Sequence, residues 1–336
     1  MRLLLITGSI PPNVCGVGDY TYKLYTHLIN QKDIQVELYY KQFWSLKYLL
    51  KYFRELKNKR VDIYHFQYPT EGYGYSLLPL LLLLLLLNKK TIVTIHELSS
   101  RNFLALLYTL ILMLIAKKVI LTNNFEKLFA TKLFVKKSKI TVIEIASNII
   151  ESLDSGRDIR DRKFDLAYFG HIRPLKGIED FLSTVSKLGK DYRVIIIGQK
   201  LDNYLDFFNY VQKKSIELKI ELIIGENENK VANLLANVKT VYLPYPDGIS
   251  IRRGTLLACI NNSCVIISKP SKDLLTNDFF NEYCYLTNSN SEASLLINEI
   301  LNLSIPIKNI LKLKTLFSWS TLINKHLKLY KTTLNI

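Results

Sequence analysis

Residues 1–19 read MRLLLITGSIPPNVCGVGD, and this stretch sets the pattern from which the fold is predicted. The apolar run Arg2–Thr7 has the length of a buried parallel strand and is too short for the core of a signal peptide. Gly8 ends the run, and Gly16 and Gly18 lie where a helix is predicted to begin. A strand, a glycine-rich loop and a helix in this order are typical of an α/β protein.

The same alternation of short β-rich runs with longer amphipathic segments continues along the whole chain. Such a pattern requires parallel strands joined by crossover helices, so the predicted fold class is α/β. The strands predicted in the first half are Arg2–Thr7, Val36–Tyr40, Asp62–Phe66, Thr91–Ile95, Val119–Thr122 and Thr141–Ile145, with helices near 18–30, 45–58, 75–88, 101–116 and 125–135. Those predicted in the second half are Leu166–Phe169, Arg193–Ile197, Glu221–Ile224, Val241–Leu243 and Val265–Ser268, with helices near 177–188, 202–217, 229–236 and 252–261.

The length of the chain predicts two domains, because 336 residues exceed what one hydrophobic core usually organises. The apolar pattern lapses between Ser147 and Lys163, where polar and charged residues dominate. We therefore predict two Rossmann-like, doubly wound domains that face a cleft, with ligands at the carboxyl ends of the strands. The predicted boundaries are 1–146 for the first domain, 147–163 for a linker, 164–314 for the second domain and 315–336 for a terminal segment.

Lysine and arginine total 45 against 29 acidic residues, which gives a formal net charge of +16. Such a surface attracts phosphates, anionic lipid or nucleic acid. The lysines are scattered and no zinc-finger, helix-turn-helix or RNA-binding signature accompanies them, so we expect no nucleic-acid partner. The four cysteines have neither CxxC spacing nor a secretory leader beside them, which predicts reduced cytosolic thiols and no structural metal.

Two strongly apolar segments, Leu77–Leu87 and Phe103–Ala116, are candidates for contact with a membrane. Both are shorter than the about 20 residues that a bilayer span needs. One interpretation is that each forms a buried helix packed on a sheet. The other is that one of them, flanked by lysines, lies in the surface of an anionic membrane.

Two loops that follow predicted strands carry candidate phosphate-binding residues. In the first, Gly16, Val17 and Gly18 allow close approach of the backbone, and amides at a helix N-terminus favour an anion such as a diphosphate. The spacing differs from the dinucleotide fingerprint, and a purely structural glycine loop is the alternative. In the second, Arg173 and Lys176 can bind a doubly charged phosphate or, alternatively, remain solvated surface charges.

The third loop, within Tyr242–Leu257, brings together an acid, a hydroxyl and two guanidinium groups. Asp247 and Gly248 form a predicted turn, and the amides that follow, from Ile249 onward, can bind a phosphate. Asp247 can accept hydrogen bonds from a sugar hydroxyl. Alternatively, Asp247 only forms the turn and the arginines only cover a helix surface. The hydroxyl and the guanidinium groups come from Ser250, Arg252 and Arg253.

With these motifs in this order, the chain resembles a family 4 retaining glycosyltransferase of the GT-B fold, of the bacterial polysaccharide-building type. The resemblance spans nearly the whole chain and rests on five matching segments. They are the glycine loop after the first strand, Thr94-Ile95-His96-Glu97, the turn Arg173–Gly177, the loop from Asp247, and Phe317-Ser318-Trp319 before a helix ending near Tyr330. In the family that helix returns to the first domain, which is the expectation for residues 315–336.

The resemblance also implies roles for individual residues. Gly16–Gly18 are expected near the donor phosphates or the reacting sugar, and Arg173 and Lys176 are expected to clamp the diphosphate. His96 would contact the transferred sugar or the acceptor; without the resemblance it is interpreted as a structural histidine. Asp247 takes the place of the first of two family glutamates.

One departure from the family pattern concerns the nucleotide ribose. Thr255 stands where the second family glutamate usually meets the ribose, so the carboxylate is missing there. Ribose recognition is therefore expected from Thr255, Glu226 or another group. Ser250, Arg252 and Arg253 also differ from the commonest family pattern and are expected to supplement the phosphate clamp.

Taken together, the resemblance implies a retaining, metal-independent transferase with a nucleotide diphosphate sugar as donor and no cofactor. The expected acceptor is a glycan or a polyprenyl-linked saccharide. The basic surface and the short apolar helices suggest a cytoplasmic protein bound peripherally at the anionic inner face of the cell membrane. The alternatives are another nucleotide-sugar enzyme on the same fold, such as an epimerase or a phosphorolytic enzyme, and a non-catalytic membrane-bound scaffold.

Overall fold

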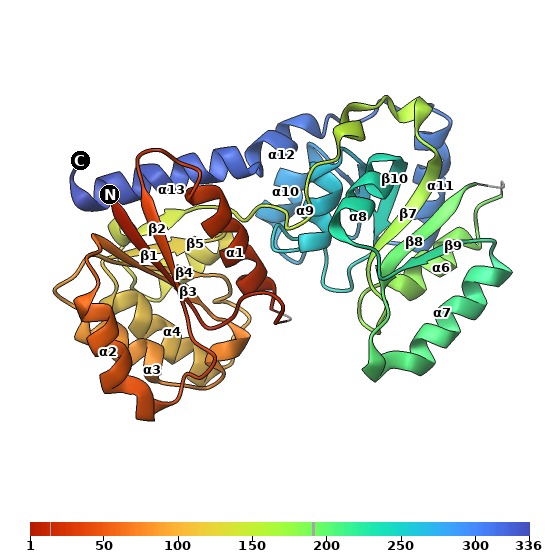
Figure 1. The fold of residues 1–336 in the computed structure, drawn as a ribbon. Helices are drawn as coiled ribbons and strands as arrows, with labels where there is room; N and C mark the ends of the chain where they lie inside the picture. Colours follow the sequence, from red (N-terminus) through yellow and green to blue (C-terminus); the bar gives the residue numbers. More distant parts are fainter. Residues whose placement is uncertain (14, 190–191) are drawn as a thin grey trace. The chain divides into compact units, whose positions relative to one another are not determined.

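The computed structural model describes residues 1–13, 15–189 and 192–336. The chain divides into two compact units, one formed by Met1–Asn148 with Trp319–Ile336 and the other by Ile149–Ser318. Each unit contains a six-stranded parallel sheet flanked by helices (Figure 1). The predicted α/β class with two doubly wound sheets is thus confirmed.

The sheet of the first unit has the strand order β2-β1-β3-β4-β5-β6, and its strands pair in parallel. Its strands are β1 Arg2–Thr7, β2 Gln35–Tyr40, β3 Ile63–Tyr68, β4 Thr91–Ile95, β5 Lys118–Leu121 and β6 Ile140–Val142. The helices of this unit are α1 Gly16–Leu28, α2 Leu49–Asn58, α3 Leu78–Leu85, α4 Phe103–Ile115, α5 Asn124–Lys132 and α13 Trp319–Leu334.

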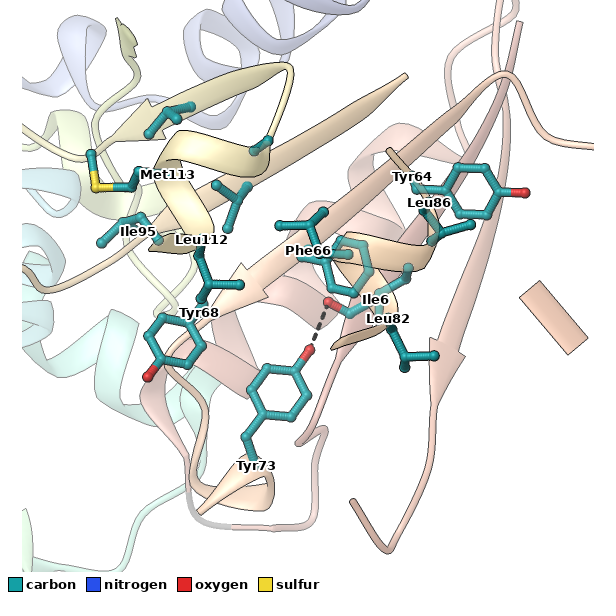
Figure 2. Packing of buried hydrophobic residues seen from close by; sticks show 14 of the residues in the cluster. Ile6, Tyr64, Phe66, Tyr68, Tyr73, Leu82, Leu86, Ile95, Leu112 and Met113 are labelled. Carbon is teal, nitrogen blue, oxygen red and sulfur yellow. Dashed lines mark hydrogen bonds between the residues drawn. The ribbon is translucent and has the colours of Figure 1, made fainter. Parts of the chain in front are cut away.

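One face of this sheet forms an apolar core with α2, α3 and α4. Side chains alternate between the two faces of a strand, so Leu4 and Ile6 of β1 point to this core together with Phe66 of β3. Figure 2 shows the cluster, in which the Tyr73 hydroxyl donates to the carbonyl of Ile6 at 3.3 Å. Both apolar segments of the sequence therefore bury one side of a helix here, Leu82 being fully buried in α3.

The opposite face of the same sheet is covered by α1 and the terminal helix α13. Leu3 and Leu5 of β1 point to this side and pack with Leu24 of α1 and Tyr330 of α13. The indole of Trp319, at the start of α13, donates to the carbonyl of Ser147 at 2.9 Å. Of the predicted terminal segment 315–336, residues 319–336 thus fold as part of the first unit, and residues 315–318 belong to the second.

The sheet of the second unit has the order β12-β11-β10-β7-β8-β9, again with parallel pairs. Its strands are β7 Phe164–His171, β8 Val194–Gln199, β9 Glu221–Ile224, β10 Val238–Leu243, β11 Val265–Ser268 and β12 Tyr285–Leu286. Its helices are α6 Ile178–Val185, α7 Leu205–Glu217, α8 Glu228–Ala236, α9 Gly254–Asn261, α10 Leu274–Asn281, α11 Asn290–Leu301 and α12 Leu311–Leu316. Helices α6, α7 and α11 share one apolar core with the sheet.

Of the linker predicted at 147–163, residues 149–163 lie within the second unit. They form two short 3-10 turns, Leu153–Gly156 and Ile159–Asp161. The guanidinium of Arg162 is buried and donates to the carbonyl of Val238 at 2.9 Å. The polar residues of this segment therefore bond to the strands of the unit.

Several elements of the second unit are absent from the sequence prediction. Strand β12 has two residues and α12 has six, which is too short for a periodic pattern to be read. Helix α11 does carry a start signal, because the Ser289 hydroxyl accepts from the amide of Glu292 at 3.2 Å, as in a capping box. The spacing of Ser289 and Glu292 can be read in the sequence.

Candidate functional site

The order of strands in the second unit defines one place where the chain reverses its direction of winding. Strands β7, β8 and β9 follow one another to one side, while β10, β11 and β12 follow one another to the other. The switch point is therefore between β7 and β10, and open α/β sheets bind ligands outside the carboxyl ends of the strands at such a point. Arg173 and Lys176 follow β7, and Asp247 and Arg253 follow β10.

The loops after these two strands are packed against each other. Gly177 has a φ of 84°, and a Cβ atom there would lie 2.0 Å from the carbonyl oxygen of Pro244. The Tyr168 hydroxyl donates to the carbonyl of Lys176 at 3.1 Å, which ties the first loop to its own strand. Only glycine permits this approach, because any side chain would force the loops apart.

These two loops carry three cations whose charges influence one another. Burial lowers the pKa of Lys176, and the nearby charges of Arg173 and Arg253 lower it further, while Asp247 opposes them. Arg253 pairs with Asp247, and its guanidinium carbon lies 4.8 Å from the ring centroid of Tyr245. The structure thus brings together the two predicted clamp residues and one of the two later arginines. This concentration of positive charge suits a doubly charged phosphate.

Helix α9 begins beside this cluster and adds amide groups to it. No side-chain cap closes its start at Arg253, and its first turn holds no acidic residue. The amides of Gly254, Thr255 and Leu256 stand in the first turn, where a helix supplies no acceptor. Helix α6, by contrast, carries Glu179 and Asp180 in its first turn. Of the two helix starts at the switch point, α9 is the one where no acidic side chain opposes the attraction of the helix dipole for an anion.

The turn before α9 is held by backbone hydrogen bonds. The amide of Gly248 donates to the carbonyl of Tyr245 at 2.9 Å, and the amide of Ile249 donates to the carbonyl of Lys269 at 2.9 Å. Gly248 has a φ of 85°, which the tight turn requires. Both amides are therefore engaged within the protein, including that of Ile249, which the sequence predicts as a phosphate-binding group.

The remaining predicted residues of this loop lie around the same turn. The Thr255 hydroxyl is 2.7 Å from the Tyr245 hydroxyl. Ser250 accepts from the amide of Arg253 with its carbonyl, at 3.0 Å, and from the amide of Arg252 with its hydroxyl, at 3.4 Å. Tyr245 is not among the site residues predicted from the sequence, although its place between Pro244 and Pro246, just after β10, can be read there.

His171, at the end of β7, is a second residue that the sequence analysis missed. Burial lowers its pKa, and so do the charges of Lys176 and Arg173. It therefore lies within the field of the predicted clamp. A histidine as the last residue of a strand at a switch point is the signal that could have found it.

In the first unit, the predicted glycines start α1. A Cβ atom on Gly18 would lie 2.9 Å from the carbonyl oxygen of Ser9, so this glycine serves close packing. Gly16 is exposed, with nothing within 4 Å of such an atom. The carbonyl of Val17 accepts from the Thr21 hydroxyl at 2.7 Å. Of the three residues, Gly16 has the most open surroundings for a ligand.

His96 follows β4 and lies close to the start of α1. Its ring meets that of Tyr20 edge to face, with 5.1 Å between the centroids. Its Nε2 lies 2.8 Å from Oε1 of Gln67, and burial lowers its pKa to about 3. The imidazole is therefore neutral at physiological pH and can act as a hydrogen-bonding group, but it carries no charge there.

Two further properties of the described residues bear on the sequence predictions. No helix among them is both long and apolar enough to pass through a bilayer. In the same ranges, no group of three or more histidine, cysteine or acidic side chains is arranged to hold a metal ion.

Comparison with known proteins places the fold among glycosyltransferase structures. No family model and no curated protein sequence matches the chain. A solved glycosyltransferase from Rickettsia africae ESF-5 is similar with a TM-score of 0.71 and 16% identity, over 99% of this chain and 98% of that one. HepE from Anabaena, solved in complex with UDP and glucose, is similar with a TM-score of 0.69 and 12% identity, over 99% and 100% of the two chains.

Two further structures share the arrangement. The lipopolysaccharide outer core galactosyltransferase WaaB, in its apo form, has a TM-score of 0.64 and 11% identity over 97% of this chain and 98% of that one. A UDP-GlcNAc 2-epimerase from Methanocaldococcus jannaschii has a TM-score of 0.67 and 12% identity over 99% and 100%. The chain therefore has the two-domain α/β fold of the GT-B glycosyltransferases.

Proposed function

We propose that this protein is a glycosyltransferase that moves a sugar from a nucleotide diphosphate sugar to a glycan or lipid-linked saccharide in surface polysaccharide synthesis. The observation that carries the proposal is that Arg173, Lys176 and Arg253 lie on the two loops that touch at the switch point of the second sheet, where the charges of both arginines act on Lys176. The open start of α9 lies beside these cations. HepE, a structural neighbour, was solved in complex with UDP-glucose, which supports a nucleotide sugar as the ligand.

The cations would act on the leaving group. In the proposed reaction the bond between the sugar C1 and the phosphate oxygen breaks, and a bond from C1 to the acceptor oxygen forms on the same face. Because the new bond forms on the face that the phosphate leaves, configuration is retained, and the acceptor proton passes to the departing phosphate. Arg173, Lys176 and Arg253 stabilise the negative charge of the diphosphate, and each such group is worth roughly 100-fold or more in rate. They supply this charge without a divalent ion.

Other residues would orient the donor and the sugar. Asp247 is exposed and can accept from a sugar hydroxyl once Arg253 turns to the phosphate. Arg252 and Ser250 would supplement the clamp, and Thr255 would meet the ribose in place of the family carboxylate. In the first unit, His96 would meet the transferred sugar or the acceptor, and the exposed Gly16 would face the donor phosphates.

A second candidate function is epimerisation of the nucleotide sugar, favoured by the UDP-GlcNAc 2-epimerase that matches 99% of this chain. The two functions are separated by incubating the protein with UDP- and GDP-sugars, with and without a saccharide acceptor, and following anomeric protons by NMR. Transfer predicts a new glycosidic signal of unchanged anomeric configuration that requires the acceptor. A sugar isomer formed without acceptor indicates an epimerase, and a need for inorganic phosphate indicates a phosphorolytic enzyme. No saturable nucleotide binding indicates a scaffold.

We further propose that α4 rests on an anionic membrane. Phe103 and Leu104 at its start are 78% and 75% exposed, and Leu107, Ile111 and Leu114 continue this exposed apolar side along the helix. Helix α3 lies next to it, since the amide of Leu80 donates to the Tyr108 hydroxyl at 3.2 Å. Helix α4 carries no charged residue, and an exposed apolar side of this kind can be buried at the boundary between lipid head groups and acyl chains.

Lysines surround the end of this helix. Lys139 donates to the carbonyl of Leu114 at 2.6 Å. Burial lowers the pKa of Lys139, and the nearby charges of Lys117 and Lys136 lower it further. An exposed apolar stripe with a cationic border is complementary to an anionic lipid surface. The polyprenyl-linked acceptor that we propose would be found at such a surface.

A further inference from the structure

The inner surface of the first unit changes from apolar to polar along β3. Ile63, His65 and Gln67 alternate with the apolar side chains of the α2–α4 core and therefore point to the side of α1 and α13. Both His65 and Gln67 are fully buried. Buried polar groups are costly unless they are hydrogen-bonded, so their partners define what they do.

These side chains form a continuous chain of hydrogen bonds that ends at His96. His96 Nε2 lies 2.8 Å from Gln67 Oε1, and Gln67 Nε2 lies 3.1 Å from His65 Nε2. His65 Nδ1 lies 2.9 Å from the Tyr330 hydroxyl of α13. The Thr94 hydroxyl of β4 is also 2.7 Å from His65 Nε2. The candidate site residue is thus linked to the terminal helix through the sheet.

The positions of the protons follow from the donors and acceptors in this chain. Burial lowers the pKa of both His65 and His96, so each imidazole is neutral and has one N–H donor and one acceptor nitrogen. The Gln67 amide nitrogen can only donate, so His65 Nε2 accepts and His65 Nδ1 donates to Tyr330. The Gln67 amide oxygen can only accept, so His96 must donate from Nε2. The remaining nitrogen of His96, Nδ1, is then an acceptor.

We propose that Gln67 and His65 are positioning residues that fix the tautomer of His96, so that its Nδ1 accepts a hydrogen bond from a hydroxyl of the transferred sugar or the acceptor. The part of this inference that concerns the sugar rests on the proposed function. No hydrogen bond from a described residue to His96 Nδ1 is present, whereas Nε2 is occupied by Gln67. A histidine anchored through one nitrogen offers the other in a fixed direction.

The terminal helix contributes to this arrangement through Tyr330. In this arrangement its hydroxyl accepts from His65 Nδ1, and it lies 3.4 Å from His326 Nδ1 in the same helix. His326 Nε2 is in turn 3.4 Å from the Tyr20 hydroxyl, and Tyr20 packs against His96. Residues distant in sequence thus set the hydrogen-bonding direction of one site histidine.

The first test reads the tautomer directly in the ligand-free protein. Long-range ¹H–¹⁵N NMR spectra separate protonated from unprotonated imidazole nitrogens, and the His96→Gln variant assigns the signals. We expect His96 with its proton on Nε2 and His65 with its proton on Nδ1. The opposite orientation of the Gln67 amide would put the His96 proton on Nδ1, and that result would overturn the proposal whether or not the protein transfers sugar.

The second test removes the link. In Gln67→Met the His96 signals should show a mixture of tautomers, and kcat for transfer should fall at least about 10-fold because the reacting group is no longer oriented. The Kd for UDP should stay within about 2-fold, since the nucleotide is held by the second unit. Gln67→Glu keeps an acceptor for His96 Nε2 and should restore the Nε2–H tautomer. If the imidazole spectra and the kcat of Gln67→Met equal those of the wild type, the inference is contradicted.

If Gln67→Met does not fold, the Tyr330→Phe variant tests the same hydrogen-bond chain at its other end. Loss of the hydroxyl should disturb the His65 signals and lower kcat in the same direction. The matched control is Tyr73→Phe, which removes an equally buried hydroxyl that bonds to Ile6 on the other face of the sheet. If both variants change the His65 and His96 spectra alike, the effect is a general one on packing and the inference fails.

Discussion

The guanidinium of Arg253 pairs with Asp247 while it covers the ring of Tyr245 at 4.8 Å from the ring centroid. Asp247 is 68% exposed on its side chain and Arg253 is 22% exposed, so the arginine is the fixed partner and the acid the accessible one. This pairing neutralises part of the positive cluster in the absence of a ligand. Removing the Asp247 carboxylate is therefore expected to have different effects on nucleotide binding and on turnover.

Asp247→Asn should separate binding from turnover. Because the substitution removes the carboxylate that competes for Arg253, affinity for UDP or GDP should stay the same or increase. If Asp247 acts on the sugar, kcat should fall roughly 100-fold or more. Calorimetry and steady-state kinetics on the same preparation measure both. A parallel loss of affinity and turnover would place Asp247 in nucleotide binding instead.

Lys176→Met should weaken nucleotide binding without loss of stability. In the free protein, burial and two neighbouring arginines lower the pKa of Lys176, so the charged side chain is held against repulsion. Removing it should leave the melting temperature equal or higher. Binding should be at least about 100-fold weaker, as expected for a lost charge contact in a partly buried site. A clear drop in melting temperature would show that Lys176 is mainly structural.

The same lysine predicts a pH dependence with a defined sign. Its pKa in the folded protein lies below the ordinary value of about 10.4. The folded state therefore binds fewer protons than the unfolded state between the two pKa values, and stability contributed by this group rises with pH across that window. Nucleotide affinity should fall over the same window as the charge is lost. Titrations of the wild type should show this fall, and Lys176→Met should lack it.

Gly177→Ala tests the contact between the two loops. The added methyl group would lie 2.0 Å from the Pro244 carbonyl oxygen, at a φ of 84° that alanine adopts only under strain. Strain of this kind costs about 1–3 kcal/mol, and nucleotide binding should weaken as the loops separate. Thermal unfolding measures the loss. The control is Gly156→Ala in the same unit, where nothing lies within 4 Å of the new atom and stability should be unchanged.

Thr255→Val tests ribose recognition. The Thr255 hydroxyl lies at the start of α9 and bonds with Tyr245, so it remains available as a second partner for a ribose hydroxyl. The wild type should bind UDP more tightly than 2′-deoxy-UDP or 3′-deoxy-UDP. In Thr255→Val, this difference in affinity should disappear for one of the two deoxynucleotides. An unchanged difference would assign the ribose contact to another group.

Leu104→Ser with Leu107→Ser tests the membrane surface. Both side chains are exposed on α4, so folding should be unaffected, while sedimentation with anionic vesicles should decrease several-fold. Leu295→Ser, an exposed leucine of the second unit, is the control. High salt should also release the wild type, because the lysine contribution is screened. Binding to neutral vesicles that persists at high salt would contradict the electrostatic part.

Much of the fold was predictable, because strand and helix periods are local properties of the sequence. Arg173 and Lys176 could be chosen as candidates because they follow a strand and are framed by glycines. Their proximity to Arg253 could not, because it depends on β7 and β10 being neighbours although they are far apart in sequence. The engaged amides of Gly248 and Ile249 likewise depend on Lys269, which belongs to a later loop.

The surroundings of His96 show a second limit of sequence-based prediction. His65 and Tyr330 bond across 265 positions, and neither differs in sequence from an ordinary residue of a strand or a helix. Only the folded sheet shows that His65, Gln67 and Thr94 point to the same side. Polar residues on an otherwise apolar strand face are the general signal, and their partners require the structure.

Titration of nucleotides by calorimetry tests the central claim most directly, namely that the switch point of the second unit binds a diphosphate. We expect saturable binding of UDP or GDP, at least about 100-fold weaker binding of the corresponding nucleoside, and a similar loss in Arg173→Ala. Arg193→Ala, an exposed arginine at the amino end of the same sheet, should bind like the wild type. Equal affinity for nucleoside and nucleoside diphosphate, or wild-type affinity in Arg173→Ala, would contradict the account.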